Sequence, residues 1–526
     1  MDTSPVIILA TINAKWIHPS LALRLLKANL GELEKDCEIL EFALRQPLHE
    51  KVGPILAARP RILGISVSIW NHLATLELLK TLNENWDAEQ KLLQRPIVVL
   101  GGPEVSWLSE EAEIFRYADY VIRGEGEESF RSLCRNIFFG KETRTGKSST
   151  GTEKDSHTVF INQGNTAVDV NTIASPYRLY TDEDLTRKLV YVEASRGCPF
   201  GCEFCQASRK PAFLEQAPVM RHSGDEPIRE FPLEPFLADM KSLINRGGRT
   251  FKFLDRTFNL DMTRVKRIME FFLVRIEALE AEKAADHKNA AIPGKPDRNR
   301  PLCVHFEMVP LRFPPELKEL IRRFPPGSLR IELGIQTFNT QTAALIHRAG
   351  SIPEEIETLE FLRRETGAIV HADLIAGLPG EDPASFEAGF DRLWMALSGA
   401  EGTSFPAEKP FEIQLGILKC LPGAPITRHN EAYKMRYDPN PPYEVIETGA
   451  MPKTELDRIK NFARFWELIV NRNPFPEMTP NLVPPGKPVF GKFMLLSDRL
   501  LEKFGRNWGI DRTELRLFFI PAGAAI

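Results

Sequence analysis

The sequence lacks the segments that direct proteins into or across membranes. Its N-terminal stretch MDTSPVIILATINAKW has no basic region, and its apolar run is too short for a signal peptide. No stretch reaches the roughly 20 apolar residues that a membrane-spanning helix requires. Cysteines are also scarce, with 7 in 526 residues, which argues against a disulfide framework and for a reducing compartment. We therefore expect a cytoplasmic protein without a membrane partner.

An excess of charge of one sign is likewise missing. The chain has 67 Lys and Arg against 71 Asp and Glu, a formal net charge of -4. This balance predicts no attraction to nucleic acid. The content of 43% hydrophobic and 26% charged residues is typical of soluble globular proteins, and the length suits two or three domains. The composition leaves the oligomeric state open.

Apolar strands alternate with helical patterns over the first 140 residues. The β-branched run Val6–Ile12 is followed by leucines at helical spacing, which end near Gly31. Buried-type strands alternating with helices indicate a parallel sheet covered on both faces. Residues 1–140 therefore predict a flavodoxin-like (Rossmann-like) α/β domain whose ligand sits at the carboxyl ends of the strands. The other predicted strands are 37–42, 62–68, 97–102 and one near 120.

Small and polar residues follow these strands where a ligand would bind. One glycine after one strand is ordinary turn chemistry, but four successive strand ends of this kind favour a binding site. Glycine lets the backbone approach a bulky ligand, and serine offers a hydroxyl group without bulk. The candidate residues are Ser66, Ser68, Gly101, Gly102, Gly124 and Glu125.

A second α/β region follows a polar linker. Residues 141–185 are the predicted linker, and within them Val159–Val170 predicts a small hairpin. Residues 186–426 carry six further strands, which suit a partial (β/α)6 TIM-type barrel with its chemistry at the strand ends. Residues 427–526 predict a mainly helical domain. Its aromatic residues Tyr443, Phe465 and Trp466 are expected in the core. The six strands are 189–193, 251–255, 303–307, 329–335, 369–375 and 411–417.

Three of the seven cysteines lie in the loop after the first barrel strand. Cys198, Cys202 and Cys205 have the spacing C-x3-C-x2-C. A structural zinc site needs four ligands, and the nearest histidine is His222, so zinc is open but poorly supported. A [4Fe–4S] cluster also needs four ligands. Three thiolates would leave one iron free to bind a small molecule.

This motif resembles that of the radical S-adenosylmethionine (radical SAM) superfamily. The resemblance implies that Cys198, Cys202 and Cys205 hold a [4Fe–4S] cluster whose free iron binds S-adenosylmethionine. One electron then cleaves a carbon–sulfur bond to give a 5′-deoxyadenosyl radical. The strand segments FLDRTFN, LRIELGIQTFN, DLIAGLPGE and LGILKCLPGAPI are similar to the family's cofactor-binding strands. They imply S-adenosylmethionine contacts from Phe204, Asp255, Glu332, Gln336, Asp373, Gly377, Gln414 and Leu418.

A flavodoxin-like domain before such a barrel resembles the cobalamin-binding subclass of that superfamily, in an uncharacterised branch with a C-terminal helical domain. The resemblance implies cobalamin at Ser66, Ser68, Gly101, Gly102, Gly124 and Glu125. The first loop, NAKWIHPSLAL, lacks the Asp-x-His-x-x-Gly motif that ligates cobalt. We therefore expect base-off, His-off cobalamin, with His18 as the alternative ligand. The C-terminal domain either packs against the barrel or recognises substrate.

Three functions remain open at this point. The favoured one is a methyltransferase that acts on an unactivated carbon of a small-molecule or peptide substrate, with an electron donor such as flavodoxin or ferredoxin. The second keeps the radical chemistry but rearranges, ring-modifies or oxidises its substrate, with cobalamin in a non-methylating role. The third is a non-enzymatic iron–sulfur or cobalamin sensor. Nothing in the sequence identifies the substrate.

Overall fold

The computed structural model describes residues 6–88, 95–140, 158–162, 167–207, 228–285, 300–348, 350–399 and 411–519. The chain divides into two compact units. The first comprises Met1–Pro199, Ser208–Leu254 and Asn289–Arg300, and the second comprises Phe200–Ala207, Asp255–Lys288 and Pro301–Ile526. The domain boundaries predicted from the sequence stay a prediction.

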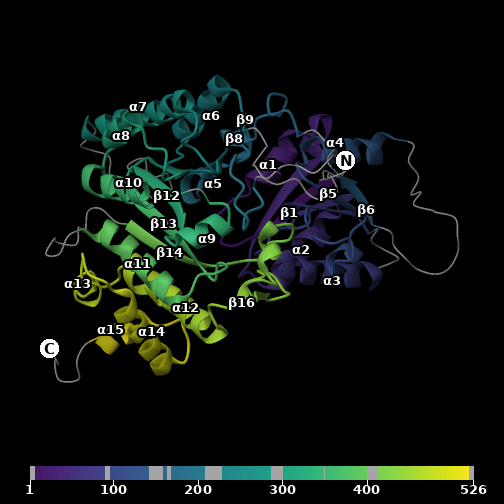
Figure 1. The fold of residues 1–526 in the computed structure, drawn as a ribbon. Coiled ribbons are helices and arrows are strands. Elements are labelled where there is room, and N and C mark those ends of the chain that lie inside the picture. The colour runs from purple at the N-terminus through teal and green to yellow at the C-terminus, as the bar shows by residue number, and fades with distance from the viewer. Residues whose placement is uncertain are drawn as a thin grey trace. The chain divides into compact units, whose positions relative to one another are not determined.

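The first unit is built around a parallel sheet in the order β2-β1-β3-β4-β5-β6. Helices cover both faces, with α1 and α4 on one and α2 and α3 on the other (Figure 1). This arrangement confirms the flavodoxin-like fold. The strands are β1 (Ile7–Asn13), β2 (Cys37–Ala43), β3 (Ile62–Ser66), β4 (Ile97–Gly101), β5 (Tyr120–Arg123) and β6 (Val159–Asn162), and the helices are α1 (Leu21–Ala28), α2 (Leu48–Ala58), α3 (His72–Ala88) and α4 (Glu127–Phe139).

Alternation along strand β1 explains why the sheet is buried on both sides. Ile7 and Leu9 pack with α1 and α4, whereas Ile8 and Ile12 pack with α2 and α3. Successive side chains of a strand point to opposite faces, so an unbroken apolar run serves two cores. Every residue of β1 is buried.

The hairpin predicted for Val159–Val170 is wrong. Strand β6 pairs in parallel with β5 at the edge of the first sheet. Its four residues are therefore a sixth strand of the first sheet, and Gln163–Thr166 lie outside the described residues. A four-residue apolar stretch does not reveal its partner, because parallel pairing joins segments that are distant in sequence.

The first unit also contains the start of the second α/β region. It comprises α5 (Asp182–Arg187), β7 (Val190–Val192), the antiparallel pair β8 (Ser195–Arg196) and β9 (Arg229–Glu230), α6 (Leu233–Asn245) and β10 (Thr250–Phe253). Arg24 of α1 is buried and forms ion pairs with Glu41, at 3.0 Å, and with Asp184, at 2.8 Å. These pairs fix α5 to the flavodoxin-like sheet.

A second six-stranded sheet has the order β14-β13-β12-β11-β10-β7. The pairs β7–β10, β11–β12, β12–β13 and β13–β14 are parallel, in agreement with the partial barrel expected from the sequence. The remaining strands are β11 (Cys303–Met308), β12 (Leu329–Gln336), β13 (Ile369–Ala376) and β14 (Phe411–Ile417). The helices are α7 (Met262–Ala285), α8 (Pro315–Arg322), α9 (Thr340–Leu345), α10 (Ile352–Glu365) and α11 (Pro383–Ser398).

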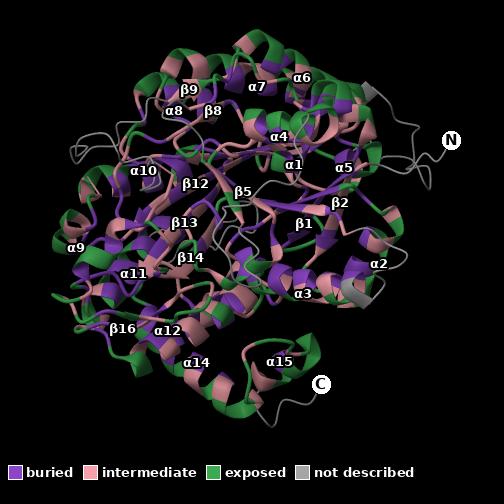
Figure 2. Cartoon of the chain, turned by 90° about the vertical axis from the view of Figure 1, so that its right-hand side faces the viewer, coloured by how far each residue is buried: buried purple, intermediate pink, exposed green. Residues whose placement is uncertain are grey.

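Burial alternates strictly along β11, β12 and β13. Figure 2 shows buried (purple) and intermediate (pink) residues on the labelled strands β12 and β13. The buried positions, such as Phe306, Leu333 and Ala372, are apolar. The intervening, partly exposed positions include His305, Glu332 and His371. One face of the sheet is therefore a core, and the opposite face carries the polar groups.

The C-terminal region is mainly helical, as predicted. An aromatic cluster joins its helices to α11 and includes Phe390, Phe462, Trp466 and Phe490. Phe465 and Trp466 are buried, which confirms their expected core position, whereas Tyr443 is only half-buried. The elements are β15 (Arg436–Tyr437), β16 (Val445–Glu447), α12 (Lys453–Trp466), a π-helical turn (Glu467–Asn471), α13 (Thr479–Leu482), α14 (Phe490–Phe504) and α15 (Arg512–Phe519). None of the helices in the described ranges combines the length and apolar character needed to span a bilayer.

Candidate functional site

The cysteine loop follows β7 and β8. Cys198 and Cys202 are buried, Cys205 is partly exposed, and all three are thiols rather than disulfides. Burial raises the pKa of Cys202, while the guanidinium of Arg348, whose Nη1 lies 3.9 Å from Sγ, acts against that rise. The backbone N–H of Ala207 donates to the sulfur of Cys205 at 3.4 Å. The loop thus already places polar donors beside two of its sulfur atoms.

These residues fit an iron–sulfur cluster by the chemistry of their donors. A cluster is held by cysteine thiolates, each bound to a different iron, so its ligands need not converge on one point. Across the described residues, no group of three or more His, Cys, Asp or Glu side chains is arranged to hold a metal ion. Arg348 would add a positive charge beside a cluster that thiolates make negative.

Asp255 lies directly after β10 and is buried, with an exposed fraction of 3%. The segment that carries it is anchored by Asn259, whose side-chain amide donates to the carbonyl groups of Val309 and Arg312 at 2.9 and 2.7 Å. The neighbouring Arg256 forms an ion pair with Glu307 at 3.5 Å. The structure therefore holds Asp255 at a firmly fixed strand end, as a cofactor-binding role requires.

Strand β12 carries two predicted site residues, Glu332 in its regular middle and Gln336 in the distorted segment at its end. Glu332 pairs with His305 of β11 at 3.0 Å. Gln336 has a φ of 71°, which is strained for a residue with a side chain, and the register shifts between Gly334 and Gln336. A Cβ at Gly334 would lie 2.3 Å from the side-chain amide nitrogen of Gln336, so a larger residue there would displace that side chain. The guanidinium of Arg348 donates to the Gly334 carbonyl group.

His371 links two adjacent strands through their polar faces. Its Nε2 lies 3.1 Å from Asp373 of the same strand, and its Nδ1 lies 3.2 Å from Glu412 of β14. The carbonyl oxygen of the Gln414 side chain is also 3.1 Å from Nε2. Burial alone would lower the pKa of His371, but the hydrogen bonds to Asp373 and Glu412 outweigh it and raise the pKa to about 10. Predicted residues Asp373 and Gln414 thus belong to one network around an imidazolium.

The remaining predicted barrel residues have packing roles in this structure. Gly377 has a φ of 85°, and a Cβ there would lie 2.5 Å from a methyl group of Val445. Leu418 is buried, its N–H donates to the Ala376 carbonyl group at 2.9 Å, and its own carbonyl group accepts from Val445. Phe204 is half-buried between two cysteines. Their contacts to S-adenosylmethionine stay a prediction.

At the carboxyl edge of the first sheet, Asn71 organises two predicted residues. Its side-chain oxygen accepts from the N–H of Ser68 at 2.8 Å, and its amide donates to the carbonyl groups of Ile12 and Ser66 at 2.9 and 3.3 Å. Thr11 donates its hydroxyl proton to the same Ser66 carbonyl group. These bonds fix the ends of the adjacent strands β1 and β3, where the strand order reverses and ligands of such sheets bind.

The glycine-rich turns at this edge differ in their roles. Gly101 is open, since a Cβ would meet only one atom within 4 Å, the Ile122 carbonyl oxygen at 3.7 Å. Gly102 has a φ of 105°, and a Cβ there would lie 2.5 Å from the Val67 carbonyl oxygen. The Gly124 N–H donates to the Ser106 hydroxyl group at 3.1 Å.

Glu125 is engaged by two arginines. It pairs with Arg229 at 2.7 Å and with Arg196 at 3.3 Å, and these contacts lower its pKa against the opposing effect of burial. Arg196 also pairs with Glu127 at 2.7 Å and lies two residues before Cys198. The turn after β5 is therefore tied to the entrance of the cysteine loop.

Large apolar side chains at the same edge fit a flat, bulky ligand. Trp16 and Ile17, after β1, are 49% and 39% exposed, and Trp70 and Leu73, after β3, are 52% and 53% exposed. Exposed large apolar side chains near the carboxyl ends of two adjacent strands are candidate contacts for an apolar ligand. His18 is half-buried, its Nδ1 lies 2.8 Å from the Tyr191 hydroxyl group, and burial lowers its pKa.

Sequence reasoning missed several of these residues. Arg348 follows a helix and carries no local sign that it contacts a cysteine 146 positions earlier. Asn71 was discernible as a polar residue in the apolar stretch SVSIWNHL. His305 and His371 stand on the polar side of strands that alternate apolar and polar residues, and that period of two was the available signal.

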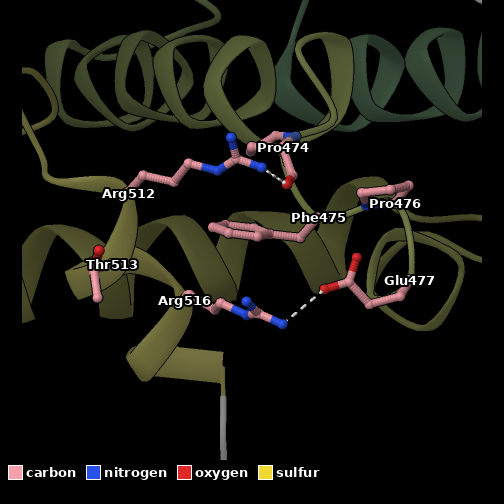
Figure 3. Close-up of a pocket in the computed structure, with 7 residues that line it drawn as sticks. All are labelled: Pro474, Phe475, Pro476, Glu477, Arg512, Thr513 and Arg516. Atoms are coloured by element: carbon pink, nitrogen blue, oxygen red, sulfur yellow. Dashed lines mark hydrogen bonds and ion pairs between the residues drawn. The ribbon is translucent and has the colours of Figure 1, made fainter.

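Two cavities lie outside the predicted set. One of about 430 Å³ adjoins the end of β12 and is lined by Thr337, Arg348 and Glu355, among others. Burial raises the pKa of Glu355 to about 7, although Arg348 opposes the rise. The other, of about 540 Å³, lies near the C-terminus, where Phe475 extends between Arg512 and Arg516 (Figure 3). It contains none of the predicted site residues.

Comparison with known families agrees with both halves of the chain. The radical SAM superfamily model matches residues 192–393, and the B12 binding domain model matches residues 7–134. The first match covers all three cysteines and the barrel through part of α11. The second covers the flavodoxin-like sheet from β1 to β5. Together the two domains imply S-adenosylmethionine, a [4Fe–4S] cluster and cobalamin.

Individual relatives are distant. An uncharacterised methyltransferase of Pyrococcus horikoshii is 26% identical over 259 residues, 47% of this chain and 50% of that protein. The cobalamin-dependent radical SAM methyltransferase TokK of Streptomyces tokunonensis is 24% identical over 170 residues, 30% of this chain and 23% of that protein. The match therefore spans half or less of these relatives' lengths.

Among solved structures, the cobalamin-dependent S-adenosylmethionine radical enzyme OxsB superposes with a TM-score of 0.59 at 14% identity, over 96% of this chain and 76% of that one. At this identity the likeness shows the fold alone. The two domain matches therefore show a B12 binding domain followed by a radical SAM domain, the combination that the name of the OxsB structure also describes.

Proposed function

We propose that this chain is an enzyme that reductively cleaves S-adenosylmethionine and, with cobalamin, methylates an unactivated carbon of a small-molecule or peptide substrate. The observation that carries the proposal is the cysteine loop, with three thiols at the end of the first barrel strand and a guanidinium beside one of them. When bound, the cluster would supply the single electron for that cleavage, drawn from a donor such as flavodoxin or ferredoxin.

The chain's own residues would bind and orient the cosubstrate. S-adenosylmethionine carries a sulfonium and an ammonium group, and carboxylates near the strand ends match this charge. Asp255 is buried at such an end and is the group proposed for the ammonium. Glu332 and Gln336 follow on β12, and Asp373 on β13 is oriented by His371. Phe204 and Gly377 are proposed to border the adenine.

For cobalamin we propose the carboxyl edge of the first sheet, in a base-off state without a histidine ligand. The exposed tryptophans Trp16 and Trp70 and the open backbone at Gly101 support this placement. The hydrogen bond between His18 and Tyr191 supports the absence of a histidine ligand. Electron paramagnetic resonance of the cob(II)alamin form tests it. Strong nitrogen splitting that disappears in His18→Ala would contradict the proposal.

The decisive experiment is anaerobic reconstitution with iron and sulfide, which should give about four irons per chain. The loaded protein is then incubated with cobalamin, reductant, methyl-labelled S-adenosylmethionine and a metabolite extract. Mass spectrometry should find 5′-deoxyadenosine and a labelled product. Cleavage with an unlabelled product would favour the non-methylating alternative, and absence of cleavage would favour a sensor. Stoichiometric zinc without iron uptake would contradict the whole assignment.

A further inference from the structure

A buried carboxylate lies inside the cysteine motif itself. Glu203 is 0% exposed and stands between Cys202 and Cys205 in the sequence C-E-F-C. Burying a carboxylate is unfavourable unless cations and hydrogen-bond donors compensate for its lost hydration. Thiolate ligands make an iron–sulfur centre negative, which adds to the cost at this position. The structure must therefore provide cations and hydrogen-bond donors that stabilise the buried Glu203 carboxylate.

Three cationic or hydrogen-bonding side chains converge on this carboxylate. Its Oε1 forms an ion pair with Arg428 and lies 3.1 Å from Nδ1 of His347. Its Oε2 lies 2.8 Å from Nε2 of His429. His347 has a φ of 49°, a strained value for a residue with a side chain, so its position is held against a backbone cost. The carboxylate is thus clamped from the end of α9 and from the segment after β14.

Backbone bonds reinforce the same clamp. The N–H of Glu203 donates to the Ile346 carbonyl group at 3.1 Å, and the N–H of Ile426 donates to the Glu203 carbonyl group at 3.0 Å. One residue beyond Cys205, the amide of Gln206 donates to the Pro422 carbonyl group at 2.6 Å. Two distant segments, around residues 346 and 422–429, therefore hold the stretch that carries two of the three thiols.

We propose that Glu203 is a positioning residue for the cluster, and that the segment 422–429 is part of the cluster site rather than a connection to the C-terminal helices. The proposal rests on the proposed function for the identity of the bound group. Neutralised by Arg428, Glu203 fixes the backbone on both sides of itself and so sets the separation and direction of the Cys202 and Cys205 sulfur atoms. Without it the loop opens, the buried Cys202 becomes accessible and the partly exposed Cys205 becomes more so.

The first arm of the test uses the protein before iron is added. Alkylation of Cys202 by iodoacetamide, followed by peptide mass spectrometry, reports how often the loop opens. Glu203→Ala should raise that rate at least about tenfold, since opening then breaks fewer bonds. Glu203→Gln should give an intermediate rate. Asp391→Ala is the matched control, because Asp391 is buried and accepts two backbone N–H bonds, from Val489 and Phe490, in the same unit.

The second arm uses the reconstituted protein. We expect Glu203→Ala to release iron to a chelator at least about tenfold faster than the wild type and to change the electron paramagnetic resonance spectrum of the reduced cluster. The Asp391→Ala control should keep the wild-type rate and spectrum. If Glu203→Ala does not fold, two milder variants replace it. His429→Ala removes one partner of the carboxylate, and Gln206→Ala removes one backbone contact. Both should raise the rates of alkylation and iron release by smaller factors.

The two arms separate the two proposals. A wild type that takes up no iron contradicts the proposed function, while the alkylation arm still tests the clamp. Equal Cys202 alkylation in wild type and Glu203→Ala contradicts the clamp, whatever the iron result. Faster alkylation that Asp391→Ala reproduces also contradicts it, because general destabilisation then explains the effect.

Discussion

The network around His371 yields a prediction whose magnitude the structure supplies. Its imidazole lies between Asp373 and Glu412, with contacts of 3.1 and 3.2 Å, and its side chain is 13% exposed. The pKa rises from an ordinary 6.5 to about 10. At about 1.4 kcal/mol per pKa unit, this corresponds to a stabilisation on the order of 5 kcal/mol. The lowered pKa of Glu412, caused first by its hydrogen bond to His371, describes the same interaction and is not added.

The perturbation is His371→Gln, which keeps a hydrogen-bonding side chain but removes the charge and leaves two carboxylates facing each other. Breaking a buried pair costs about 3–5 kcal/mol. The unfolding entropy is about 2.1 cal/mol/K per residue, so for the full chain of 526 residues we expect the Tm at pH 6.5 to fall by roughly 3–5 °C. His49 is exposed on α2, and the control His49→Gln should change the stability by less than about 0.5 kcal/mol.

The pH dependence provides the sharper test. The folded-state pKa lies above the unfolded one, so the stabilisation is complete below pH 6.5 and is lost as the pH rises through about 10. The difference in Tm between wild type and His371→Gln should shrink over this interval. The pKa of the partner Glu412 is lowered, first by its hydrogen bond to His371, so the partner does not titrate in this interval. A charged His371 would be refuted if the difference in Tm stays constant from pH 6.5 to above 10. It would also be refuted if the two proteins differ by less than about 1 kcal/mol in the free energy of unfolding at pH 6.5.

Three further outcomes are expected. Cys202→Ala should abolish iron uptake, whereas Cys37→Ser should leave the iron content unchanged, because burial raises the Cys37 pKa to about 12 and keeps it a protonated core residue. Loss of iron in Cys37→Ser would contradict this. Asp255→Ala should weaken S-adenosylmethionine binding about 10- to 100-fold with the cluster present. The measurement is the rate of 5′-deoxyadenosine formation at increasing S-adenosylmethionine concentration. An unchanged saturation curve would exclude a contact between Asp255 and S-adenosylmethionine. Ser68→Leu should block cobalamin binding, measured by absorbance, without loss of iron. Normal cobalamin binding by Ser68→Leu would show that the cobalamin site lies elsewhere. Gly102→Ala should lower the Tm, because its Cβ would lie 2.5 Å from a carbonyl oxygen.

Local patterns were sufficient for the architecture. Strand β1 is an unbroken apolar run because both of its faces are buried, and that property is visible without any knowledge of its neighbours. The pattern of β11 to β14 is also visible in the local sequence, because their alternating polar residues mark the face opposite the core. The cysteine motif is also local, since its three residues lie within eight positions. The pairing of strand β6 could not be predicted in this way, because four residues do not specify a partner strand.

The sequence by itself determined the two α/β regions, their order and the three thiols, because periodicity and short spacing are properties of neighbouring residues. Only the tertiary structure decided which side chains surround those thiols. Arg348 reaches Cys202 across 146 positions, and His429 reaches Glu203 across 226. It also decided that Glu125 pairs with Arg229 and that His371 is shared between two strands. The strength of the interaction between two charges depends on their distance in space, and for residues far apart in the sequence only the folded structure sets that distance.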